Sequence, residues 1–97
     1  MGLSIYWILI MANIKVEYLD DKRQFSVENK PVILKYLVYL FEYKMSIPYY
    51  ENIEFSINDK IIFSDKKTEL DSIIGFNLVE DNNYKLKYYW YVKNRNF

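Results

Sequence analysis

Apolar and polar residues alternate with a period of two in two neighbouring stretches near the start of the chain. Ile14, Val16 and Tyr18 occupy every second position, and Phe25 and Val27 do the same beyond the turn-forming residues DDK. This spacing points successive side chains to opposite faces of a strand. The pattern therefore predicts a β-hairpin with a short loop.

The apolar spacing then changes to that of a helix. Asn29 is a capping residue and Pro31 suits a first helical turn, so the sequence predicts a helix that runs to about Met45. The predicted polar side of this helix carries Lys35, Tyr39 and Glu42. The apolar residues cover more than half of its circumference, and they are Ile33, Leu34, Leu37, Val38, Leu40, Phe41 and Met45.

A helix with such a wide apolar face packs on a sheet and has apolar surface left over. The excess surface predicts dimerisation or the docking of a partner through the helix, with Tyr36 and Tyr43, or Tyr49 and Tyr50, as contacts. The N-terminal apolar surface is the other candidate for a homodimer contact. The alternative is a well-covered core that the N-terminal residues LSIYWILI help to shield.

Period-two alternation returns after the helix, which Pro48 prevents from continuing. Ile53, Phe55 and Ile57 alternate with polar residues, Asn58-Asp59 is a turn sequence, and the apolar run IIF follows. These residues predict a second pair of strands joined by a tight turn.

The last third of the chain predicts a short helical turn and a closing strand. Leu70 and Ile73 fit the turn, and Gly75 suits the left-handed conformation that ends many helices. After the turn sequence EDNN, the strand runs from Tyr84 to Val92, and its expected core face carries Tyr84, Leu86, Tyr88, Trp90 and Val92.

This order of elements, over about residues 13–93, resembles that of the ubiquitin-like β-grasp family. The matching stretches are Ile47-Pro48, Asn58-Asp59-Lys60, Thr68-Glu69-Leu70, Gly75-Phe76 and the strand Tyr84 to Val92. The resemblance implies an α+β fold in which a mixed sheet of four to five strands packs on one α-helix. Because a chain of 97 residues is expected to form one domain, we predict a single β-grasp domain over residues 11–97.

Two departures from the family change what the resemblance implies. Conjugated and sulfur-carrying members end in Gly-Gly, whereas this chain ends VKNRNF and its only glycines are Gly2 and Gly75. The position of the apolar patch through which many members bind partners is taken by Ser56. The resemblance therefore implies a non-conjugating interaction module of the adaptor or inhibitor type.

Composition narrows the possible chemistry. The 97 residues include no cysteine and no histidine, which excludes disulfides, thiol or imidazole catalysis and histidine-dependent triads. The acids fall in predicted turns or on exposed strand faces rather than in a cleft, and no glycine-rich phosphate loop is present. We therefore expect no enzyme activity, no catalytic residues, no metal and no cofactor.

Residues 1–10 form an apolar segment for which two interpretations stand. The segment either extends the first strand or precedes a domain that begins at Met11. About 20 apolar residues are needed to span a bilayer, and the apolar run that ends before Lys15 reaches only about a dozen, so no membrane span is expected. The lack of cysteine fits a cytoplasmic protein. A membrane-associated protein led by residues 3–12 is a weaker alternative.

The second face of the closing strand is the candidate binding surface. Its residues combine cationic and aromatic side chains and are Lys85, Lys87, Tyr89, Tyr91 and Lys93. The plainest interpretation is a solvated sheet face whose tyrosines pair across strands and whose lysines discourage edge aggregation. If the face has a function, we expect it to contact another protein. The alternative is a small nucleic-acid-binding protein that uses the same face, because tyrosines can stack on bases and lysines can neutralise phosphates. The formal net charge of zero makes nucleic acid the less favoured partner.

Overall fold

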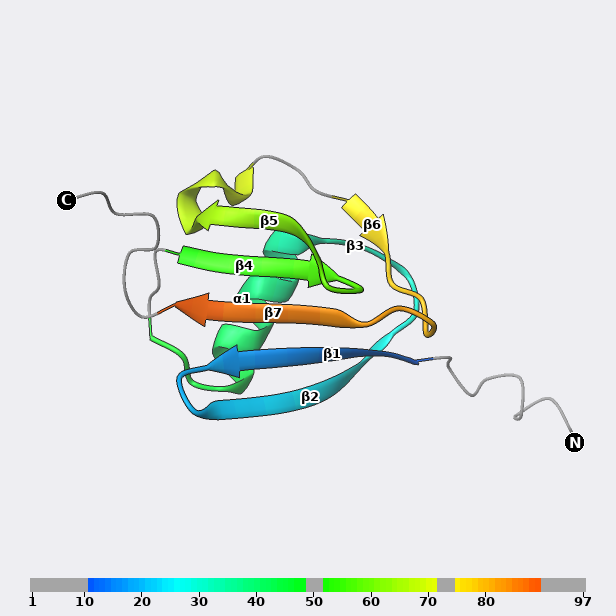
Figure 1. Cartoon of the computed structure of the whole chain (residues 1–97), viewed down its shortest axis with the longest axis horizontal. Helices are drawn as coiled ribbons and strands as arrows, with labels where there is room; N and C mark the ends of the chain where they lie inside the picture. The colour runs from blue at the N-terminus through cyan, green and yellow to red at the C-terminus, as the bar shows by residue number, and fades with distance from the viewer. Residues whose placement is uncertain (1–10, 49–51, 72–74, 90–97) are drawn as a thin grey trace, which may run out of the picture.

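In the part of the chain that the structure describes, a five-stranded mixed sheet carries one α-helix on one of its faces (Figure 1). The computed structural model describes residues 11–48, 52–71 and 75–89. In chain order the elements are β1 (Met11–Tyr18), β2 (Asp21–Glu28), β3 (Pro31–Ile33), α1 (Leu34–Lys44), β4 (Asn52–Ile57), β5 (Lys60–Lys66), the 3-10 helix η2 (Lys67–Asp71), β6 (Gly75–Asn77) and β7 (Tyr84–Tyr89). The arrangement is α+β and β-grasp-like, as predicted.

The strand order in the sheet is β2-β1-β7-β4-β5. The closing strand β7 therefore lies at the centre, parallel to β1 and antiparallel to β4. The two predicted hairpins flank it, β1 with β2 on one side and β4 with β5 on the other. A separate ribbon of two short strands, β3 and β6, lies beside the sheet at the start of the helix (Figure 1).

The β1–β2 turn is tighter than the sequence predicts. Tyr18 pairs with Asp21, which leaves Leu19 and Asp20 as the loop, and Asp21 already belongs to β2. Leu19 has a φ of 53°, in the left-handed region that non-glycine residues seldom adopt. The turn therefore uses residues one position earlier than the predicted DDK.

The helix begins later than predicted, so the assignment of Asn29 and Pro31 to its start is wrong. Pro31 opens β3, where it pairs with Asn77 of β6, and Val32 pairs with Phe76. The N-cap of α1 is Ile33, which supplies no side-chain hydrogen bond. The ribbon forms because the side chains of Val32 and Phe76 pack against the core, and this tertiary contact overrides the local helix-start pattern.

The prediction that Gly75 ends a helix in the left-handed conformation is also wrong. Gly75 is the first residue of β6 and pairs with Ile33 of β3, and its φ is not positive. Its extended backbone is open to any residue. A side chain at this position would not clash, because an added Cβ would meet no atom within 4 Å. The absence of a side chain therefore leaves open space beside Gly75.

The end of α1 is set by Ser46 rather than by Pro48. Ser46 has a φ of 52°, and its N–H reaches the carbonyl of Tyr43 at 3.3 Å. The N–H of Ile47 donates to the carbonyl of Glu42 at 2.9 Å. These two bonds form a Schellman motif, in which a left-handed residue satisfies the last carbonyls of a helix. Pro48 then follows an end that is already formed.

The core lies between the sheet and α1. The helix contributes Leu34, Leu37, Val38 and Phe41, all of which are buried. The central strand shows the predicted alternation, with Tyr84, Leu86 and Tyr88 buried and Lys85, Lys87 and Tyr89 on the other face. Trp90 and Val92, also predicted to face the core, lie outside the described residues.

Candidate functional site

The predicted binding face is the side of the sheet that points away from α1. Lys85, Lys87 and Tyr89 lie there on β7, each partly exposed. Tyr91 and Lys93 lie outside the described residues. The register of the sheet then shows which charged residues from neighbouring strands surround this set.

A row of alternating charge crosses the outer face. Lys22 pairs with Glu17, Glu17 with Lys87, and Lys87 with Glu54. Directly opposed residues in a sheet lie close enough for opposite charges to attract. Each charge in this row therefore faces the opposite sign on the next strand. In the adjacent row, Lys15 and Lys85 stand side by side.

The side chains of this face bind one another. Lys85 Nζ lies 3.3 Å from Glu17 Oε2. Lys87 Nζ lies 5.1 Å from the centre of the Tyr89 ring, and the Tyr89 hydroxyl donates to Glu54 Oε1 at 3.3 Å. Neighbouring carboxylates therefore offset much of the positive charge that would attract a phosphate backbone. This makes a solvated polar face a better interpretation than a nucleic-acid-binding face.

The helix side of the molecule is different, because aromatic and apolar side chains are prominent among its exposed residues. The side chains of Tyr36, Tyr39 and Tyr43 are 52%, 46% and 85% exposed. Positions three, four and seven apart lie on one side of a helix, so these tyrosines form a stripe along α1. Ile33, 45% exposed, continues the stripe at the start of the helix. We call these four residues the aromatic stripe.

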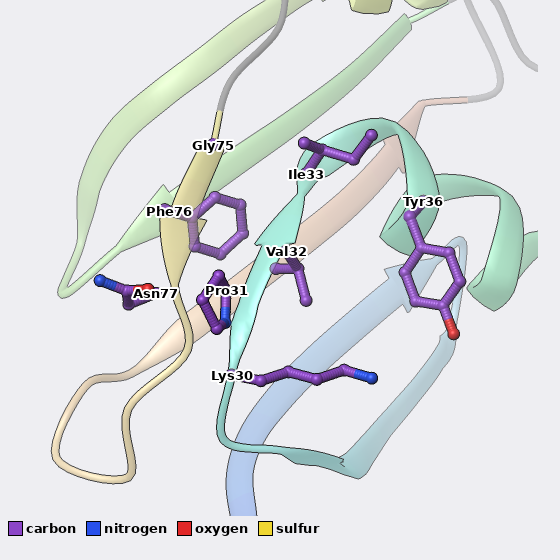
Figure 2. A pocket seen from close by; sticks show the side chains of 8 residues that line it. All are labelled: Lys30, Pro31, Val32, Ile33, Tyr36, Gly75, Phe76 and Asn77. Atoms are coloured by element: carbon purple, nitrogen blue, oxygen red, sulfur yellow. The ribbon is translucent and has the colours of Figure 1, made fainter.

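A groove of about 670 Å³ lies at the start of the aromatic stripe. Figure 2 shows Lys30 and Tyr36 projecting on the same side of β3, with Val32 between them, and Phe76 pointing from β6 toward β3. The absent side chain of Gly75, opposite Ile33, leaves the groove open at that point. The lining residues are Lys30, Pro31, Val32, Ile33, Tyr36, Gly75, Phe76 and Asn77.

The groove is apolar and carries positive charge. Its eight lining residues include Lys30 but no carboxylate. The first turn of α1 has no acidic residue and no side-chain cap, so the positive end of the helix dipole is not neutralised there. The sequence predicted exposed contacts at Tyr36 and Tyr43. It did not predict the groove, which exists only because β3 meets β6.

Glu42, predicted to lie on the solvent side of α1, is instead covered by a lysine from η2. Lys67 Nζ lies 2.7 Å from both carboxylate oxygens and donates a hydrogen bond to Oε1. The side chains of Lys67 and Glu42 are only 6% and 12% exposed. The same ammonium group lies 4.6 Å from the centre of the Tyr39 ring. This buried ion pair connects η2 to the helix and holds Tyr39 in the aromatic stripe.

Tyr88 anchors the same region from the sheet. Its hydroxyl donates to the carbonyl of Val38 at 2.5 Å and lies in the core. Burial raises the pKa of Tyr88 above its ordinary value, and the negative charge of Glu42 adds to this shift. The phenol therefore stays protonated and acts as a hydrogen-bond donor to the helix backbone.

We expect the raised pKa of Tyr88 to make the protein less stable at high pH. Above about pH 10 the unfolded chain loses this proton while the folded protein keeps it, so the free energy of unfolding falls as pH rises, by about 1.4 kcal/mol per pH unit from this group. Tyr88→Phe removes this dependence. Urea unfolding from pH 9 to pH 11 should show a shallower decline for Tyr88→Phe than for the wild type, and parallel declines would contradict the assignment.

The described residues contain no group of three or more His, Cys, Asp or Glu side chains arranged to hold a metal ion. They also contain no helix with the length and apolarity needed to cross a membrane. No known protein family, curated protein or solved structure matches this chain.

Proposed function

We propose that this protein is a non-catalytic, non-conjugating interaction module that binds a segment of another protein on its helix side. The observation that carries the proposal is that the aromatic stripe runs into the groove, because Ile33 and Tyr36 belong to both. Tyrosine is enriched among the residues that dominate the binding energy of protein interfaces. Exposed apolar patches and grooves often mark interaction sites. The β-grasp-like arrangement supports the same class of function.

The chemistry of the groove defines the kind of segment it fits. Val32, Ile33 and Phe76 offer apolar contacts, and Lys30 and the uncapped start of α1 offer positive charge. A partner segment with an apolar side chain next to a carboxylate complements both features. We therefore expect the groove to take the apolar side chain and Lys30 to face the carboxylate.

The outer sheet face stays the alternative docking surface. Lys85, Lys87 and Tyr89 are accessible there, but their contacts with Glu17 and Glu54 must be loosened before a partner can use them. The same contacts weaken support for the nucleic-acid alternative, since each lysine that is already neutralised releases fewer counterions on binding. We therefore place the proposed site on the helix side.

Gly75→Val is expected to weaken partner binding at least about tenfold while leaving the fold intact, because one hot-spot contact is worth about 2 kcal/mol or more and about 1.4 kcal/mol is tenfold in affinity. An added Cβ at Gly75 meets no atom within 4 Å, so the substitution places apolar bulk at the lining of the groove without a backbone clash. A partner is first captured from an extract of the source cells and purified, and its affinity is then measured by calorimetry for the wild type, Gly75→Val, Tyr36→Ala and Tyr89→Ala.

Tyr89→Ala is the matched control, since it removes a tyrosine from the opposite face. The proposal requires weaker binding by Gly75→Val and Tyr36→Ala together with unchanged binding by Tyr89→Ala. The reverse pattern would assign the partner to the outer sheet face instead.

A further inference from the structure

The outer edge of β2 is a long strand edge with no partner strand among the described residues. β2 is eight residues long and pairs only with β1, so it ends the sheet along its lower side in Figure 1. Its register with β1 runs unbroken from Asp21 to Glu28. The opposite edge, β5, is interrupted by an irregularity in its pairing with β4. A regular, unpaired edge is a template for another strand.

The side chains of β2 are arranged to complement a second copy of the same strand. Antiparallel strands related by a two-fold axis through Phe25 place Phe25 opposite its own counterpart. In that register Lys22 lies opposite Glu28 of the other copy, and Gln24 lies opposite Ser26. Each Lys–Glu contact occurs twice because of the symmetry. Directly opposed pairs of opposite charge stabilise antiparallel strands.

Neighbouring registers lack this complementarity. An axis through Gln24 puts Lys22 opposite Ser26 and brings Asp20 against Glu28. An axis through Ser26 brings Lys22 against Lys30. The charges on this edge therefore favour one register, and they also discourage slippage into its neighbours.

Phe25 adds an apolar contact at the centre of the same register. Its ring packs against Phe41 of α1, with 4.9 Å between the ring centres, and the residue is only partly buried. Two such rings that meet across the axis would cover each other and continue the core from one copy to the next.

We propose that two copies of this protein associate through antiparallel pairing of their β2 strands, with the two-fold axis at Phe25. The two sheets become one continuous sheet, and the free N–H and C=O groups of both edges are paired. The axis is perpendicular to the sheet, so both helices lie on the same face. The dimer therefore presents two groove surfaces in one direction, which suits a partner that carries two binding segments.

Charge reversal tests this register. Lys22→Glu and Glu28→Lys each bring like charges together in the homodimer, so each should raise the dimer dissociation constant by roughly tenfold to a hundredfold. An equimolar mixture of the two variants restores both Lys–Glu contacts and should form heterodimers. Sedimentation velocity measures the state of each sample, and circular dichroism confirms that each variant folds. Lys60→Glu, an exposed lysine on β5, is the matched control and should behave as the wild type.

The variant with both substitutions, Lys22→Glu with Glu28→Lys, keeps the complementarity and should dimerise like the wild type, even if a single variant folds poorly. A wild-type protein that remains monomeric up to about 1 mM would overturn the proposal. Equal dimerisation by wild type and both single variants would also overturn it and point to the helix side. Failure of both the mixture and the doubly substituted variant to dimerise would exclude this register. None of these results depends on the partner proposed for the groove.

Discussion

Leu86→Ala is expected to lower the free energy of unfolding by about 3 kcal/mol, within the range for removing a fully buried leucine. Leu86 is 0% exposed and lies at the middle of the central strand, opposite Val16 of β1 and Phe55 of β4. Three close-packed strands and the helix surround the cavity that the substitution leaves. Because small domains have a total stability of about 5–15 kcal/mol, this loss is a large fraction of the whole.

The next residue along the strand is the matched control. Lys87 lies partly exposed on the outer face, and Lys87→Ala removes its contact with the Tyr89 ring but opens no cavity in the core, so we expect a change of about 0.5 kcal/mol or less. Urea unfolding of both variants, followed by circular dichroism at one pH, measures the difference. Equal losses for the two substitutions would contradict the assignment of the two faces of β7.

The alternation of β7 is the part of the fold that local sequence predicts well. A period of two assigns residues to opposite faces without knowledge of any neighbouring strand, and Leu86 and Lys87 lie on opposite faces as the pattern requires. The hairpin around Val16 and the strand pair around Phe55 are predicted for the same reason. Local spacing is sufficient wherever one face of a strand is buried and the other is open.

The β3–β6 ribbon could not be predicted in this way. Pro31 and Asn77 are far apart in the sequence, and each strand has only three residues, which is too short for a periodic signal. The local pattern of Asn29 and Pro31 indicates a helix start, and only the packing of Val32 with Phe76 overrules it. The groove was missed with the ribbon because it is built on that pairing.

In the candidate site, too, local properties could be predicted from the sequence and contacts between distant residues could not. The exposure of Tyr36 and Tyr43 follows from the excess of apolar residues on one helix, which is a local property. The pairing of Lys87 with Glu17 and Glu54 depends on sheet register, which no single strand reveals. The period-two spacing alone therefore identified the residues of the outer face, but it did not identify the contacts that offset their charge.

Glu42 shows how a helix pattern can mislead about exposure. Its position relative to the apolar face assigns it to solvent, and in the folded chain Lys67, twenty-five residues later, covers it. The sequence contains no periodic signal that joins these two residues. A tertiary contact thus converts an apparently solvated acid into half of a buried ion pair.

Lys67→Met is expected to lower the free energy of unfolding by about 3 kcal/mol, because it leaves the Glu42 carboxylate largely buried and without its counter-charge. Glu42→Leu should lower the free energy of unfolding by a similar amount, since it leaves the Lys67 ammonium group buried without its counter-charge. Lys66→Met, which changes the exposed lysine immediately before it, is the matched control and should stay within about 0.5 kcal/mol of the wild type.

The variant with both Lys67→Met and Glu42→Leu decides between two accounts of this contact. Removing two buried charges together abolishes their desolvation cost as well as their attraction, so we expect a stability within about 1 kcal/mol of the wild type, or above it. A double-mutant cycle from urea unfolding gives the coupling energy directly. If the two single losses simply add, the residues do not form a buried pair. If they are strongly non-additive, Lys67 and Glu42 form the buried ion pair that connects η2 to α1.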